Sequence, residues 1–141
     1  MNFNFLQSAP IGGVGVWDIT KISGRHSIGS YGSGATIETN QLDLIPVKAK
    51  IIQLQFHGIL LNKNVERLSE LHILFSYDPN FQFGIGRLDL TTTLSKERSE
   101  NNCMIMTPWD ITDRKIYLDI VANIIHAEAG HLGMTAIGYW E

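Results

Sequence analysis

Two histidines and a glutamate near the C-terminus are the closest approach of this sequence to a metal site. His126, Glu128 and His131 lie within one six-residue run, and imidazole and carboxylate groups are both common zinc ligands. The helical metalloprotease pattern needs two histidines four residues apart, with a glutamate directly after the first. Here the histidines are five residues apart, and Gly130 would weaken any helix. We therefore predict no metal, and leave open whether a hairpin turn brings these three side chains together.

The serines and glycines do not form a catalytic or phosphate-binding motif. Ser27, Ser30 and Ser33 lie in a glycine-rich stretch, and none is the serine of a Gly-x-Ser-x-Gly elbow. The glycine clusters at 12–15 and 32–34 are not followed by the helical pattern that a phosphate-binding loop requires. The carboxylates are dispersed, so the sequence offers no carboxylate pair of the glycosidase kind. We predict that the protein is not an enzyme and has no cofactor.

An aromatic residue beside a carboxylate occurs twice, in the tetrapeptide Trp-Asp-Ile-Thr at residues 17–20 and 109–112. The flanking sequences differ, so the repeat does not establish a duplication. On exposed loops such pairs suit sugar recognition, because the ring stacks on C–H groups and the carboxylate accepts hydroxyl hydrogen bonds. One interpretation is therefore a carbohydrate-binding module that uses Tyr31, Trp109 and Asp110, with Trp109 as the more exposed tryptophan. In the other, each tryptophan fills one end of a β-sandwich and the aspartate caps a turn.

The composition is that of one packed domain with few charges. The chain has 141 residues, of which 44% are hydrophobic and 18% charged, and its formal net charge is -3. Its single cysteine, Cys103, excludes an intramolecular disulfide and is predicted to be a small buried hydrophobe. Scattered Lys and Arg residues argue against nucleic-acid binding. We see neither a signal-peptide pattern nor an apolar stretch of membrane-spanning length, and expect synthesis in the cytosol.

The most strongly patterned stretch, residues 47–61, alternates apolar and polar residues with a period of two. This is the pattern of a β-strand with one buried face. The parity changes between Ile51 and Ile52, and we interpret the change as a β-bulge that keeps the apolar side chains on the buried face. The pattern therefore predicts a long, bent central strand, with Leu54 and Phe56 among its core residues.

Further strands follow at regular spacing. Residues 71–77 and 81–94 alternate on either side of a proline turn and predict a β-hairpin, with a second parity change at Gly84 and Gly86. The polar run 95–102 is predicted to be a solvated loop. The remaining predicted strands are residues 103–106, 116–126 and 132–140. About six long strands are therefore expected after residue 42.

Residues 1–41 differ from the rest of the chain because short apolar pieces alternate with glycines. Glycine at this density favours turns and cannot support a core alone. Two interpretations remain open: an edge hairpin of the same sandwich, or an extended arm that lies on a neighbouring subunit or on another partner. We favour the arm and assign the sandwich domain to residues 42–141. The predicted subunit contacts in the arm are Phe3, Phe5, Gly12, Gly13 and Trp17.

Strands at this spacing, separated by Gly, Pro and Asn, predict an all-β fold. We expect an antiparallel two-sheet β-sandwich, jelly-roll-like, of about eight strands with a glycine-rich N-terminal arm. The segments 116–125 (IYLDIVANII) and 134–141 (MTAIGYWE) resemble the last strands of small jelly-roll head domains of phage fibres and capsid decoration proteins. The resemblance is confined to the end of the chain and contains no diagnostic motif.

These features together predict a non-enzymatic, self-assembling structural protein, a virion component such as a capsid, decoration or fibre-head protein. The expected partners are further copies of the chain and other structural proteins, because closed symmetric oligomers cover strand edges and apolar faces. The alternative, a lectin-like module, would bind a surface glycan instead. The expected location is the virion for a viral protein and the cytoplasm otherwise.

Overall fold

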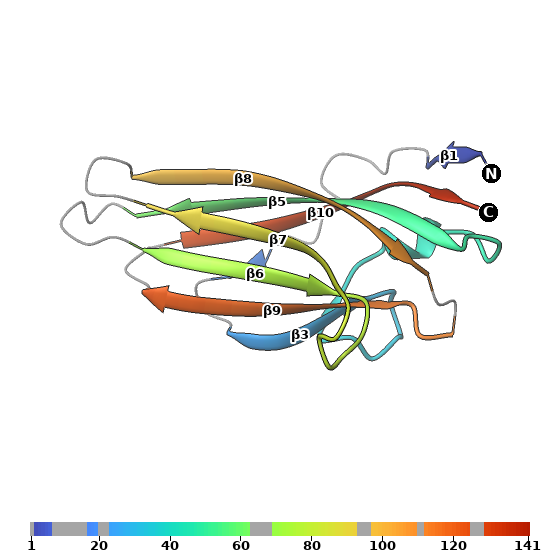
Figure 1. Ribbon diagram of the computed structural model, residues 1–141, viewed down its shortest axis with the longest axis horizontal. Helices are drawn as coiled ribbons and strands as arrows, with labels where there is room; N and C mark the ends of the chain where they lie inside the picture. The colour runs from blue at the N-terminus through green and yellow to red at the C-terminus, as the bar shows by residue number, and fades with distance from the viewer. Residues whose placement is uncertain are drawn as a thin grey trace.

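The protein is a β-sandwich of two packed, largely antiparallel sheets (Figure 1). The computed structural model describes residues 2–6, 17–19, 23–62, 69–92, 97–109, 112–124 and 129–141. The long strands run along the long axis of the molecule, and the two ends of the chain lie side by side at one end of it (Figure 1). Among the described residues, no helix has the length and apolar character needed to cross a membrane.

The first sheet, sheet A, contains the longest strands. Its five strands are β1 (Phe3–Phe5), β2 (Trp17–Asp18), β5 (Ile51–Leu61), β8 (Arg98–Pro108) and β10 (Ala129–Trp140). The order across the sheet is β1-β10-β5-β8, and the two-residue β2 also pairs with β10. All of these pairs are antiparallel. Because β1 pairs with β10, the first and last strands of the chain lie next to each other.

The second sheet, sheet B, has the order β4-β3-β9-β6-β7. Its strands are β3 (Gly24–Gly29), β4 (Ile37–Glu38), β6 (Glu70–Ser76), β7 (Gly84–Thr91) and β9 (Lys115–Ile124). The short β3–β4 pair is parallel and the others are antiparallel. A 3₁₀ turn, η1 (Leu42–Leu44), follows β4 and leads toward β5.

The core lies between the inner faces of the two sheets. In β5, as the alternation predicts, Ile52, Leu54 and Phe56 are fully buried. Phe56 stacks on Phe75 of β6 with ring centroids 4.1 Å apart, so one aromatic pair joins the sheets across the core. A Cβ on Gly58 would lie 2.8 Å from the side chain of Leu88, which means that the sheets approach closely here because this residue has no side chain.

The predicted bulge at the start of β5 is wrong. β5 begins at Ile51 and keeps one continuous register with β8 along its whole length. The residues before it form a turn, in which the Ala49 N–H donates to the Pro46 carbonyl at 3.1 Å. Apolar and polar residues alternate in this turn as they would in a strand. The bulge is instead in β10, where the register with β5 shifts between Ala136 and Gly138.

The predicted loop at residues 95–102 is also corrected, because β8 begins inside this run. β8 is the edge strand of sheet A, and its polar side chains bond to the neighbouring edge of sheet B. The Thr91 N–H donates to Ser99 Oγ at 3.1 Å, and the Asn101 side-chain amide donates to the Asp89 carbonyl at 3.2 Å. A polar strand is stable in this position because backbone groups of β7 become partners of its side chains.

The other strand predictions are confirmed, apart from their number. β6 and β7 form the expected hairpin, and their register shifts where Gly84 and Gly86 flank one extra residue. Six long strands, β5 to β10, follow residue 42. The described residues contain ten strands rather than eight because residues 1–41 contribute four short ones. Of these, β1 and β2 lie along β10, while β3 and β4 form one edge of sheet B.

Candidate functional site

The outer face of sheet A begins with an aromatic cluster at the chain ends. The Phe3 ring lies 4.8 Å from the Phe5 ring and 4.6 Å from the Trp140 ring, centroid to centroid. Register explains the contact, because Phe3 is opposite Trp140 and Phe5 is opposite Gly138. Phe5 is 78% exposed, so the cluster presents an aromatic ring to solvent.

The apolar surface continues from this cluster across the next two strands. Trp140 is opposite Ile51 in β5, and Ile51 is opposite Pro108 in β8. Along β8, Met104 and Met106 point outward and are 51% and 58% exposed. We call these seven residues the apolar face: Phe3, Phe5, Ile51, Met104, Met106, Pro108 and Trp140. The described part of this face carries no carboxylate, ammonium or guanidinium group.

The rest of the outer face of sheet A mixes amide, imidazole, hydroxyl and apolar side chains. A shallow hollow of about 490 Å³ lies over β5, β8 and β10, lined by Gln55, His57, Ile59, Asn102, His131, Gly133 and Thr135. His57 Nδ1 lies 2.6 Å from Asn102 Oδ1, and its Nε2 lies 3.7 Å from a Glu100 carboxylate oxygen. The formal charges on β5 and β8 lie at the edge of this hollow, at Glu100 and its partner Arg98.

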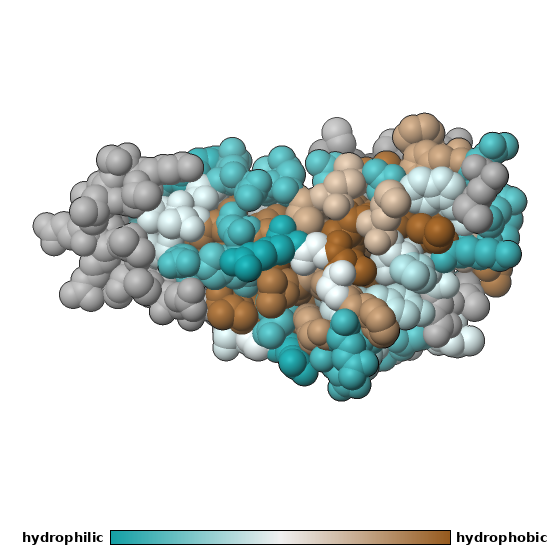
Figure 2. Space-filling view, in the orientation of Figure 1, coloured by the Kyte–Doolittle hydropathy of each residue, from teal (hydrophilic) through white to brown (hydrophobic). Residues whose placement is uncertain are grey.

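A second apolar area lies where the edges of the two sheets meet. Tyr77, Phe83, Ile85 and Pro108 line a hollow of about 380 Å³ between β7 and β8. Figure 2 shows apolar residues gathered in this middle part of the surface, with hydrophilic residues around them. Since Pro108 belongs to both groups, this hollow is continuous with the apolar face of sheet A.

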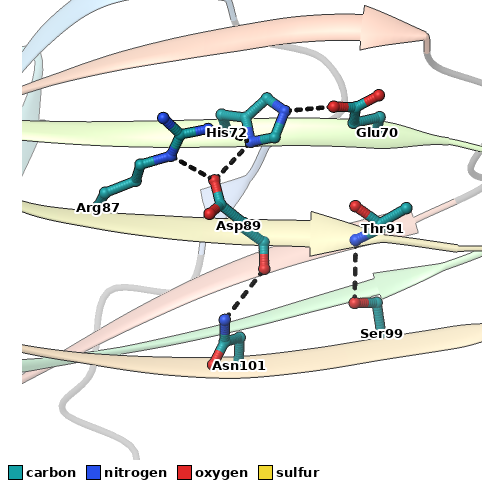
Figure 3. A network of polar contacts seen from close by, with 7 residues as sticks. All are labelled: Glu70, His72, Arg87, Asp89, Thr91, Ser99 and Asn101. Atoms are coloured by element: carbon teal, nitrogen blue, oxygen red, sulfur yellow. Dashed lines mark hydrogen bonds and ion pairs between the residues drawn. The ribbon is translucent and has the colours of Figure 1, made fainter.

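The outer face of sheet B, in contrast, carries paired charges. His72 of β6 lies between two carboxylates, with Nε2 2.6 Å from Glu70 and Nδ1 2.5 Å from Asp89 (Figure 3). Arg87 of β7 contacts the same Asp89 carboxylate at 2.7 Å. The hydrogen bonds to Asp89 and then Glu70 raise the pKa of His72, and Arg87 and then His72 lower the pKa of Asp89. These groups neutralise one another, which makes this face a solvated one.

A polar pocket of about 400 Å³ lies beside sheet B, where three connections meet. It is lined by Ser30, Tyr31, Gly32 and Ser33 after β3, by Asp43 of η1, and by Thr112, Asp113, Arg114 and Lys115 before β9. We call it the loop pocket. Its lining is mostly polar and contains two carboxylates, two cations and several hydroxyl groups.

The backbone around the loop pocket is held in one arrangement. The Ser33 N–H donates to the Ser30 carbonyl at 3.0 Å, and the Gly32 N–H donates to Glu38 Oε1 at 3.2 Å. Gly32 and Arg114 both have positive φ angles, of 78° and 51°. A non-glycine residue in this region costs energy and marks a loop whose surroundings fix its shape.

Ser30 is the unusual member of this lining. Its residue surface is 4% exposed, and among the described residues its Oγ has no hydrogen-bond partner. Buried hydroxyl groups are nearly always hydrogen-bonded, because an unsatisfied one loses its bonds to water without replacement. Asp113, on the other side of the pocket, accepts a 2.8 Å hydrogen bond from the Tyr117 hydroxyl. Burial, and then Asp113, raise the pKa of Tyr117 to about 12.

The structure brings two of the five predicted subunit-contact residues together. Phe3 and Phe5 form the exposed aromatic cluster described above. Trp17 is in β2, opposite Leu132 of β10, but its side chain is not among the described parts of the structure. Gly12 and Gly13 lie outside the described residues. The contacts themselves remain a prediction.

The predicted sugar-binding residues are separated by burial. Tyr31 is 63% exposed and lines the loop pocket, but Trp109 is 7% exposed and belongs to the core, so the expectation that Trp109 is exposed is wrong. Its backbone N–H donates to the Lys50 carbonyl at 2.8 Å, which ties the end of β8 to the start of β5. Asp110 lies outside the described residues.

The three candidate metal ligands cannot be compared as a group. His126 and Glu128 lie outside the described residues, and His131 lies on β10 as an exposed residue that lines the hollow of sheet A. The described residues contain no cluster of three His, Cys, Asp or Glu side chains suited to a metal. Cys103 is partly buried against the core, and burial raises its thiol pKa.

Sequence reasoning missed most of the apolar face. The run Cys-Met-Ile-Met before Thr107 has apolar residues at both parities, so its pattern does not tell which side chains point outward. The structure buries Ile105 and exposes Met104 and Met106. A usable signal was the pair of phenylalanines two residues apart at the N-terminus, since that spacing puts both on one face of a strand.

Comparison with known proteins identifies no relative of this chain. The chain matches no protein-family model, no curated protein and no solved structure.

Proposed function

We propose that this chain is a non-enzymatic structural protein that associates with copies of itself through the outer face of sheet A. The observation that carries the proposal is the contrast between the two outer faces of the sandwich. The face of sheet B has paired charges, whereas the apolar face of sheet A exposes Phe5 at one edge and Met104 and Met106 at the other, joined across the sheet by the row Phe3, Trp140, Ile51 and Pro108. Contiguous exposed apolar surface of this kind is rare on monomers and marks an interface.

The outer face of sheet A, of which the apolar face is one end, can accommodate a second copy of the chain. β5 has 11 residues, so this outer face is about 37 Å long, and the three long strands β10, β5 and β8, about 4.8 Å apart, make it about 14 Å wide. The product, about 500 Å² before the three-residue β1 is added, is somewhat below the roughly 800 Å² that each partner contributes to a standard interface. The lack of net charge on the face also favours a like partner over an oppositely charged one.

We further propose that the sandwich is a jelly roll. Without the two-residue strands β2 and β4, eight strands remain in the orders β1-β10-β5-β8 and β3-β9-β6-β7. The first and last strands are neighbours, and the chain passes repeatedly from one sheet to the other. Two four-stranded sheets of this kind support a double Greek key, the arrangement of many viral capsid and lectin domains. This supports the assignment to a virion component, in a capsid, decoration or fibre-head role.

The first test is the solution mass of the full chain, measured by light scattering after size exclusion. Wild type should have an integer multiple of the chain mass, and a Met104→Glu/Met106→Glu variant should be monomeric with an unchanged circular dichroism spectrum. Val121→Glu is the matched control, because Val121 is a 38% exposed strand residue on the outer face of sheet B. A monomeric wild type, or a double variant that keeps the wild-type mass, would overturn the proposal.

The virion assignment has a separate test. Mass spectrometry of virus particles purified from the source should recover the chain at a fixed ratio to the other particle proteins. Its absence from such particles would reject the virion role and leave self-association to be judged by the mass measurement.

A further inference from the structure

We propose that the loop pocket is a carbohydrate-binding site for a neutral sugar unit. This inference is independent of self-association, because the pocket is formed by connections beside sheet B and shares no residue with the apolar face of sheet A. Its volume of about 400 Å³ falls in the range of about 300–1,000 Å³ that is typical of small-molecule sites.

The chemistry of the lining selects the ligand class. Asp43 and Asp113 offer acceptors for hydroxyl groups, while Lys115 and Arg114 bring an equal number of positive charges to the same pocket. A site with balanced charges gives no net attraction to an anion. A neutral ligand with many hydroxyl groups, each of them both donor and acceptor, fits such a mixture.

Tyr31 supplies the surface on which a sugar ring can stack. The side chain is 63% exposed although it belongs to a well-fixed turn, and it lines the pocket. Aromatic rings with a polar tip pack against apolar faces while the hydroxyl remains solvated. Tyr31 therefore takes the role that the sequence had suggested for Trp109.

Ser30 gives independent evidence that a ligand belongs here. Its Oγ is buried and has no partner among the described residues, although Ser30 lines the pocket. A ligand hydroxyl would satisfy this group, so that its desolvation no longer opposes folding. Asp113 is prepared in a similar way, because the Tyr117 hydroxyl and Lys115, whose Nζ lies 3.9 Å away, hold its carboxylate in place before any ligand binds.

The test is saturation-transfer NMR on the full-length chain with a defined panel of probes. The neutral probes are the methyl glycosides of glucose, galactose, mannose and N-acetylglucosamine, and the anionic probes are sialic acid and inorganic phosphate. We expect transfer to at least one neutral probe and none to phosphate. Absence of transfer to every neutral probe, or transfer only to the anionic ones, would overturn the proposal.

Variants assign the signal to the loop pocket. Tyr31→Ala should weaken binding of the positive probe about tenfold, and Ser30→Ala about three- to tenfold, because each removes one direct contact. Phe83→Ala is the matched control, since Phe83 is an aromatic residue of nearly equal exposure, 64%, outside this pocket. It should bind like wild type. Unchanged affinity in both Tyr31→Ala and Ser30→Ala would show that the sugar binds elsewhere and would reject the assignment.

Discussion

The ring of Phe3 packs against the ring of Trp140, 4.6 Å away between centroids, so that the first and last strands of the chain are joined on the outer face of sheet A. Gly138 of β10, which is opposite Phe5, leaves space for the Phe3 ring because it has no side chain. A Cβ there would overlap the Phe3 ring and lie 2.5 Å from the Asn4 carbonyl oxygen.

We therefore expect Gly138→Ala to push β1 away from β10. The overlap is with backbone as well as with an aromatic ring, so relaxation should cost about 1–3 kcal/mol of unfolding free energy. Urea denaturation at fixed protein concentration measures the loss, and light scattering should show weaker self-association because Phe3 and Phe5 leave the apolar face. Full stability together with full association would contradict this account of the chain ends.

The close approach of β7 to β8 gives a second prediction. A Cβ on Gly86 would lie 2.5 Å from Ile105 Cγ2 and 3.0 Å from Cys103 Sγ. Gly86→Ala should therefore force the two sheet edges apart and lower the unfolding free energy by about 1–3 kcal/mol. Gly84→Ala in the same strand is the control, because nothing lies within 4 Å of its Cβ position. Equal midpoints for the two variants in a urea titration would refute the packing argument.

Both glycines show what the sequence can and cannot reveal. The parity change at Gly84 and Gly86 indicated an irregular strand, because alternation is a local property. Which side chains Gly86 would meet depends on β8, the next strand of the chain, which belongs to the other sheet. The prediction of a bulge at Ile51 was wrong for a different reason. Residues 46–49 form a turn whose apolar and polar residues alternate as they would in a strand, and periodicity alone does not distinguish a turn from a strand.

The two candidate sites also differ in how much of each could be predicted from the sequence. Phe3 and Phe5 could be proposed as contacts because they lie in an apolar piece of the glycine-rich N-terminal segment, and their spacing of two puts both on one strand face. The loop pocket could not be proposed as a unit, since Ser30, Asp43 and Asp113 come together only after three connections fold beside one another. Trp109 was misjudged because the residue after a proline turn was expected to be exposed, whereas burial of the large ring completes the core.

His72 makes the stability of sheet B depend on pH. Its pKa is raised in the folded protein by Asp89 first and Glu70 second, while Arg87 opposes the shift. The β9 residue opposite His72 is Val121, so that strand adds no charge at this position. Because the folded pKa is the higher one, the stabilisation is fully present below the unfolded value of about 6.5 and is lost as pH rises through the folded pKa.

We therefore expect His72→Gln to be destabilised most at about pH 5–6, where the imidazole is charged and the carboxylates are still ionised. The difference from wild type should shrink at higher pH. Thermal unfolding of both proteins from pH 5 to pH 9 measures it, with His26→Gln as a control, because His26 Nε2 lies 3.0 Å from the neutral Ser23 carbonyl. A difference that is constant over this pH range would contradict the proposed role of the charge.

The stacked pair Phe56 and Phe75 joins the two sheets, with centroids 4.1 Å apart and planes inclined by 29°. If the stacking itself stabilises the sandwich, the two residues should be coupled energetically beyond the area that each buries. Phe56→Leu and Phe75→Leu should each be destabilising, and the double variant should lose less than the two single losses together, by about 0.5–1.5 kcal/mol. Urea denaturation of the four proteins at one protein concentration gives this coupling. Strict additivity would mean that the rings act only as separate fillers of the core.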